Sequence, residues 1–229
     1  MRALRILLIL AVVLGGVLVG IDRLAVSYAE SEASSRVKLS AADSESVDVD
    51  IKGFPFLTQV ADKRFDEVDV TAKGVRTTAG SRRIRVDELT AVLRDVTVTG
   101  DWAGAKAGSA SGTALISYAD LNAAAADQGA TVGYGENGKV KVTGGVRILG
   151  RTLTRTVVST VTVVDGGTIR VRADRVPGEG IPGVEELVRA RTDFERPIGM
   201  IAGMRVEKVE PRPDGLAVTV TGKDVVLAG

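Results

Sequence analysis

The sequence predicts an α+β protein in which an N-terminal membrane helix precedes a single domain built on a strongly bent antiparallel sheet. Three observations lead to this fold class. Residues 6–21 form an uncharged apolar run behind two arginines. From residue 47 onward, apolar and polar residues alternate in one segment after another, as in strands with one solvated face. Turn sequences such as Asp165-Gly166-Gly167 separate these segments, which favours antiparallel pairing of neighbours.

The N-terminal run has the composition of a membrane span or a signal peptide. Arg2 and Arg5 precede it, and Asp22 follows it. As a helix the run would be about 24 Å long, slightly less than the ~30 Å hydrocarbon core of a bilayer. The basic side is expected to stay in the cytoplasm, which places the rest of the chain on the extracytoplasmic side. We assign residues 1–23 to a signal-anchor or signal peptide and residues 24–229 to the domain.

Cleavage behind this run is an open alternative. Ala25-Val26-Ser27 is an acceptable cleavage site, and its use would give a secreted domain. However, Ile21, Leu24, Ala25 and Tyr28 continue one apolar helical face beyond the run. This continuity favours an uncleaved, single-pass anchor in the cell membrane.

Composition excludes several classes of function. The chain has no cysteine and no histidine, which removes thiol nucleophiles, Cys/His zinc sites and triads with an imidazole base. The net charge of +1 gives no general attraction for nucleic acid. Hydrophobic residues make up 45% of the chain but aromatic residues only 3%, so aliphatic side chains must build the core. No cofactor is predicted.

The strand pattern starts at Val47, Val49 and Ile51, which alternate with charged residues. A long candidate strand covers residues 84–98, and its apolar phase slips near Glu88 and near Asp95. Bulges or a strong bend are expected there. Further strands are expected at 68–72, 110–116, 130–134, 139–148, 153–164, 168–173, 205–209 and 216–227.

Two short helices are expected between the strands. Ser117 can cap the first, with Asp120 three residues later, and Gly129 ends it. The second is expected over residues 183–194, between two prolines.

Two apolar clusters are candidate sites. Phe54, Phe56, Leu57 and Phe65 fit either an apolar lip that receives acyl chains or an aromatic plug of the core, with equal weight. Met200, Ile201 and Met204 offer flexible thioethers that suit variable chains, although methionines more often fill gaps in a core. These seven residues are the candidate lipid-binding set.

Acidic residues form a third cluster. They are Asp43, Glu45, Asp48, Asp50, Asp66, Glu67 and Asp69. A hydrolase or a calcium site would need such carboxylates, but Asp48 and Asp50 lie at alternate positions of a strand, on its solvated face. No segment has the spacing of a calcium-binding loop. We therefore predict neither catalytic nor metal-binding residues.

Three separated motifs resemble the actinobacterial LmeA-like phospholipid-binding family. They are Gly53-Phe54-Pro55-Phe56-Leu57-Thr58-Gln59, Arg64-Phe65-Asp66-Glu67-Val68-Asp69-Val70 and Tyr118-Ala119-Asp120-Leu121-Asn122. They occur in the expected order, and the resemblance covers nearly all of residues 24–227.

The resemblance implies a tubular lipid-binding (TULIP-like) domain, in which a curved antiparallel sheet wraps about a helix and encloses an apolar groove. The expected partners are phospholipid and the membrane. The family is associated with the cell envelope and, in mycobacteria, with lipomannan elongation, but no residue here indicates the latter.

Two hypotheses from different classes follow. The first is a non-enzymatic phospholipid binder that holds acyl chains in an apolar groove and serves lipid carriage or assembly of envelope glycolipids. The second is an envelope enzyme, or its accessory subunit, that uses the carboxylate cluster. The absence of His and Cys favours the first.

Overall fold

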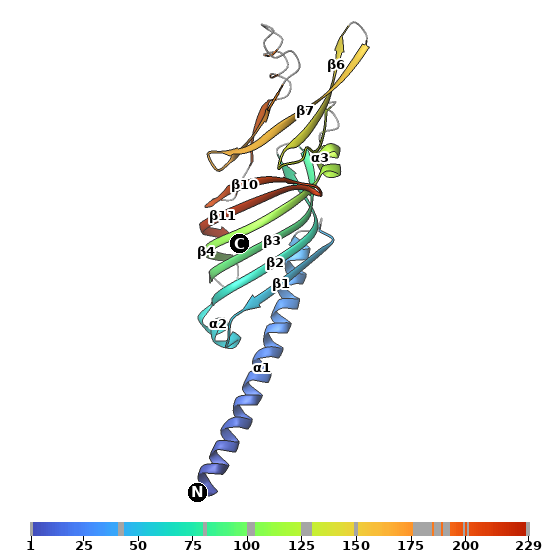
Figure 1. Ribbon diagram of the computed structural model, residues 1–229. Helices are drawn as coiled ribbons and strands as arrows, with labels where there is room; N and C mark the ends of the chain where they lie inside the picture. Colours follow the sequence, from blue (N-terminus) through green and yellow to red (C-terminus); the bar gives the residue numbers. More distant parts are fainter. Residues whose placement is uncertain are drawn as a thin grey trace.

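The computed structural model describes residues 2–40, 44–79, 82–99, 104–124, 130–148, 151–175, 185, 189, 193–198, 200 and 202–227. A long helix leads into two antiparallel sheets that follow one another along the molecule (Figure 1). The helices are α1 (Arg2–Ser40), α2 (Phe56–Asp62) and α3 (Tyr118–Ala124). The strands are β1 (Ser46–Lys52), β2 (Arg64–Ala79), β3 (Arg82–Thr99), β4 (Gly104–Ser117), β5 (Ala130–Tyr134), β6 (Val140–Ile148), β7 (Arg151–Val164), β8 (Thr168–Ala173), β9 (Phe194–Pro197), β10 (Met204–Arg212) and β11 (Gly215–Leu227).

The six-stranded sheet, called the large sheet, has the order β1-β2-β3-β4-β11-β10. The five-stranded small sheet has the order β5-β6-β7-β8-β9. All neighbouring strands pair antiparallel, which confirms the predicted α+β class with an antiparallel sheet behind an N-terminal helix. The sequence alone did not predict that the strands divide between two sheets.

The large sheet changes its apolar phase along a row of residues near Asp95, as the sequence indicated. Asp95 on β3 and Asp224 on β11 both have left-handed backbones, with φ of 51° and 52°. Gly108 of β4 lies between them in the register, where a Cβ would come within 3.0 Å of the Cβ of Asp95. The pairing of β3 with β4 keeps its register across this row, so the change of phase comes from backbone conformation and not from a bulge.

The second predicted slip, near Glu88, has a matching feature on the neighbouring strand. Glu88 pairs with Lys73 of β2, and the next residue of β2, Gly74, has a φ of 62°. A Cβ at position 74 would collide with the Glu45 side chain at 2.4 Å. The left-handed backbone favours glycine at position 74, and a larger residue would also displace the flexible Glu45 side chain.

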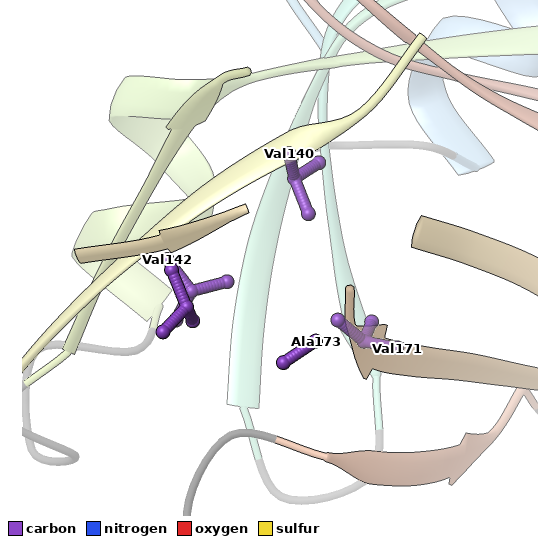
Figure 2. Close-up of a cluster of buried hydrophobic side chains, with 5 residues drawn as sticks. Val140, Val142, Val171 and Ala173 are labelled. Carbon is purple, nitrogen blue, oxygen red and sulfur yellow. The ribbon is translucent and has the colours of Figure 1, made fainter. Parts of the chain in front are cut away.

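The small sheet has its own valine core. Val140, Val142, Val157, Val171 and Ala173 are all buried and form one cluster, which Figure 2 shows in close-up. Tyr118 of α3 and Leu216 of β11 pack against this cluster and join it to the large sheet. The 165–167 turn adds a backbone link, since the amide of Val206 on β10 donates to the carbonyl of Gly166 at 2.7 Å.

The predicted helix start at Ser117 is confirmed. The Ser117 hydroxyl accepts from the amide of Asp120 at 3.1 Å and donates to the Asp120 carboxylate at 2.7 Å. Gly129, the predicted end, lies outside the described residues. Of the second predicted helix, the structure describes Glu185 and Arg189 in helical conformation, and Phe194 instead begins strand β9.

Candidate functional site

The register of the large sheet aligns apolar residues into rows that cross all six strands. Directly opposed residues of antiparallel strands share a face, and alternate residues along a strand return to it. The first row is Ile51, Val68, Leu93, Ala110, Gly222 and Met204. The second is Val49, Val70, Ala91, Gly112, Val220 and Val206. The third is Val47, Ala72, Leu89, Ala114, Val218 and Val209.

These three rows define what we call the inner face. Every position in them is apolar. In the second row the two end residues, Val49 and Val206, are buried, at 5% and 2% exposed. In the middle, Val70, Ala91 and Val220 are only half-buried. These three side chains therefore keep exposed apolar area that a further apolar molecule could cover. In a fully packed core no such area would remain.

The opposite face of the large sheet is mostly polar. The row of this face that lies between the first two apolar rows is Asp50, Asp69, Val92, Ser111, Thr221 and Arg205, and charged pairs cross the strands nearby. Lys52 pairs with Asp50, and the hydrogen bond from its ammonium group lowers the pKa of the Asp50 carboxyl. Arg94 pairs with Glu67 at 2.7 Å. Asp48 and Asp50 are both exposed, which confirms the predicted solvated position of these two carboxylates.

The carboxylate cluster has no arrangement suited to a metal. Among the described residues, no group of three or more acidic side chains is close enough to hold an ion. Glu45 pairs with Arg85 at 2.9 Å, so it too has a basic partner. Asp43 lies outside the described residues.

Helix α1 is the element that closes the free edge of the large sheet. Glu30 accepts from the amide of Ile51 at 2.9 Å, and Ser34 accepts from the amide of Val49 at 3.0 Å. Both amides belong to the outer edge of β1, which would otherwise be open to another strand. Sequence reasoning missed this role, although the spacing of four between Glu30 and Ser34 is what one helix face requires.

The face of α1 that packs on the domain lies beside the apolar face noted in the sequence. Of the four residues that continue that apolar face beyond the run, Ile21, Leu24 and Tyr28 are 50%, 74% and 75% exposed, and Ala25 is half-buried. Asp22 and Val26 are buried instead, at 3% and 7%. The largest apolar side chains of this part of α1 therefore point away from the domain, while Val26 packs in the core and Asp22 makes a polar contact.

The contact of Asp22 is with the start of α2. Its Oδ1 accepts from the amide of Leu57 at 2.9 Å. Pro55, which precedes α2, provides no side-chain cap, so a carboxylate from a distant helix satisfies this amide. The other oxygen, Oδ2, is buried without a hydrogen-bond partner.

The four predicted residues around α2 divide into two pairs. Phe56 and Phe65 are buried, with ring centroids 6.2 Å apart, in a core with Val26, Val96 and Ala107. Phe54 and Leu57 point outward and are 55% and 44% exposed. Phe56 and Phe65 therefore belong to the core, whereas Phe54 and Leu57 are accessible from outside.

Gln59 has a structural role that composition did not reveal. It is 8% exposed; its amide nitrogen donates to the carbonyl of Lys52 at 3.2 Å, and its Oε1 accepts from the amide of Asp66 at 2.9 Å. One side chain therefore holds β1, α2 and β2 together. A Cβ at Gly53 would meet this amide group at 2.6 Å, so the glycine leaves room for it.

The methionine cluster lies at the other edge of the large sheet. Met204 begins β10 and ends the first row of the inner face, where Gly222 leaves space for its sulfur, 2.5 Å from the position of a Cβ. Met200 is half-buried just before β10, and Ile201 lies outside the described residues. The structure does not bring the methionines together with the phenylalanines, since four strands separate β1 from β10.

Two open hollows lie on the small sheet, away from the inner face. Their volumes are about 330 and 450 Å³, and both are lined by Arg170 and Arg172. These cations already have partners, because Arg170 pairs with Glu195 and Arg172 lies 3.7 Å from Asp193. The arginines that line the hollows are thus neutralised by neighbouring carboxylates. The hollows do not provide an apolar binding surface.

Comparison with known proteins agrees with this geometry. No curated protein and no solved structure matches the chain. A family model described as LmeA-like phospholipid-binding matches residues 20–221, which include all of the inner face except Gly222, and the α1 contacts with β1 and α2. The chain therefore belongs to the LmeA-like phospholipid-binding family.

Proposed function

We propose that this protein is an extracytoplasmic phospholipid binder that holds acyl chains along the inner face of the large sheet. The observation that carries the proposal is the alignment of three apolar rows across six strands, with half-buried aliphatic groups in the middle. Each methylene of an acyl chain buried there would contribute about 0.8 kcal/mol. Membership of a phospholipid-binding family supports the same ligand class.

The proposed location is the cell membrane, with α1 as a single-pass anchor and the sheets outside the cytoplasm. Helix α1 is long and apolar enough near the N-terminus to cross a membrane, and its uncharged run, residues 6–21, ends at Asp22. Arg2 and Arg5 on the N-terminal side favour retention of that end in the cytoplasm. Cleavage behind Ser27 would remove Asp22 and Val26 from their buried contacts, which supports an uncleaved anchor.

A carrier or an assembly factor for envelope glycolipids fits this site better than an enzyme. Of the predicted carboxylates, Asp50, Glu67 and Glu45 have Lys or Arg partners. Catalytic carboxylate pairs need one group with a raised pKa, whereas the pKa of Asp50 is lowered.

The test is to fill the inner face and count bound lipid. Ala91→Phe adds a ring to the middle row, whereas Thr90→Phe adds the same ring to the polar face one residue earlier. Full-length protein purified in detergent is extracted, and phospholipid per chain is measured by mass spectrometry. We expect Ala91→Phe to lose most of its bound lipid and Thr90→Phe to keep it, at equal thermal stability. Equal lipid content in both variants would contradict the inner-face site.

A further inference from the structure

We infer that Phe54 and Leu57 insert into the interfacial layer of the leaflet from which α1 emerges, and so give the domain a second contact with the bilayer. The inference rests on the proposed role of α1 as a membrane anchor. It assigns these two residues to the bilayer surface and leaves the inner face as the site for the bound lipid.

The level of α2 along α1 is set by one hydrogen bond. Asp22 is the first charged residue after the apolar run, so it marks where α1 leaves the hydrocarbon. The Leu57 amide donates to its carboxylate at 2.9 Å. The start of α2 therefore lies at the depth of the membrane boundary, and Figure 1 shows α2 at the end of the large sheet nearest the N-terminal part of α1.

The exposure of the side chains at this level is selective. Phe56 is 4% exposed, while its neighbours Phe54 and Leu57 are 55% and 44% exposed. Large hydrophobic residues that are exposed beyond the apolar run, among those described, are Leu24, Tyr28, Phe54, Leu57, Phe194 and Val226. Four of these six belong to α1 or the start of α2. Such a concentration of exposed apolar groups is typical of a surface that water does not cover in the working state.

The polar groups beside these residues suit the headgroup layer. The Arg23 guanidinium lies 5.3 Å from the centre of the Phe54 ring. In this geometry the ring can face the acyl boundary while the cation meets lipid phosphates. Tyr28 lies about 10 Å further along the helix than Ile21, beyond a headgroup layer about 5–8 Å thick, so the proposed contact does not include it.

The contact is held in one orientation because α1 is tied to the domain at three points. Asp22, Glu30 and Ser34 each accept a backbone amide from α2 or β1. A tilt of the domain that lifted Phe54 from the bilayer would therefore have to break these bonds or bend an unbroken helix. In this proposal, α1 and the segment with Phe54 and Leu57 therefore contact the bilayer in a fixed orientation relative to each other.

Depth-dependent fluorescence quenching tests this inference in the full chain. Trp102 is first replaced by Phe, and a single tryptophan is then introduced by Phe54→Trp or Leu57→Trp. Phe194→Trp is the matched control, since Phe194 is 43% exposed but lies on the small sheet. The variants are reconstituted into phosphatidylcholine and phosphatidylglycerol vesicles in which the phosphatidylcholine is brominated high on one acyl chain.

We expect the tryptophans at 54 and 57 to lose most of their emission to the brominated lipid, and the one at 194 to lose none. Equal, weak quenching at all three positions would overturn the inference. Quenching at 54 in detergent, by protein that carries only its bound brominated lipid, would also overturn it and would make Phe54 a lip of the lipid site. Absence of bound phospholipid in detergent contradicts the proposed function but leaves the vesicle result intact, so the two failures are distinguishable.

Discussion

The carboxylate of Asp22, on the N-terminal helix α1, accepts a hydrogen bond from the backbone amide of Leu57, 35 residues later, at 2.9 Å. This bond replaces the side-chain cap that Pro55 cannot supply to α2. Asp22→Ala should therefore destabilise the domain by about 1 kcal/mol, the usual cost of a lost cap. Asp22→Asn retains the acceptor oxygen and is the control. Hydrogen exchange of the Leu57 amide measures the effect; unchanged protection in Asp22→Ala would contradict the capping role.

The two phenylalanines on either side of Pro55 should respond in opposite ways to truncation. Phe56→Ala removes a buried ring that contacts Phe65, and it should cost about 3 to 5 kcal/mol in the free energy of unfolding. Phe54→Ala removes an exposed ring and should change stability by no more than about 0.5 kcal/mol. Thermal and denaturant unfolding of the detergent-solubilised protein separate the two. A large loss of stability in Phe54→Ala would show that its ring packs in the fold.

The left-handed backbone at Asp95 predicts which substitutions that strand position accepts. Asp95 has a φ of 51°, a conformation that β-branched residues adopt only with strain. Asp95→Val should destabilise the large sheet by about 1 to 2 kcal/mol, whereas Asp95→Asn should be nearly neutral. The midpoint of chemical denaturation is the measurement. A stabilising Asp95→Val would mean that the strand can straighten, and that the change of phase does not depend on this residue.

Asp174 predicts an acid-sensitive step in the stability of the small sheet. Hydrogen bonds from Lys139 and then Thr160 lower the pKa of the Asp174 carboxyl below its ordinary value of 3.8. A group whose pKa is lower in the folded state stabilises that state above the unfolded pKa, and this contribution is lost as pH falls through the folded value. Asp174→Asn should therefore lower the melting temperature at pH 7 and flatten its decline below about pH 4.

The control for this pH dependence is Asp165→Asn, which changes an exposed residue in the turn between β7 and β8. Melting temperatures recorded from pH 7 downward should show the wild-type decline in this variant. If the melting temperature of Asp174→Asn falls with pH in parallel with that of the wild type, Asp174 does not contribute to the acid sensitivity.

Local patterning was sufficient to predict the strands, because alternation records which residues of a strand face water. It even located the change of phase near Asp95, since apolar residues three positions apart, such as Leu93 and Val96, cannot share one face of a regular strand. The division into two sheets depends on which strands pair with each other. Long-range packing decides this pairing. The helix predicted at Ser117 shows that the β4 to β5 connection is not a hairpin, but it does not show that β5 begins a second sheet.

The candidate site was only partly predictable for the same reason. Phe54 and Phe56 are two residues apart in the same motif, and only the folded chain shows that one is exposed and the other buried. The partner of Asp22 is 35 residues away and that of Glu30 is 21, so their roles as acceptors for backbone amides leave no local pattern. The inner face required the register of six strands, because each strand contributes only three of its residues.

The position of β11 sets an order of events for the biogenesis of this protein. This last strand of the chain lies inside the large sheet, between β4 and β10 (Figure 1). Because synthesis proceeds from the N-terminus, β1 to β4 are made early, and the edge of β4 stays exposed until β10 and β11 are available. The apolar rows therefore remain incomplete until β11 has been made. A chaperone that covers the edge of β4 would protect the chain during this interval.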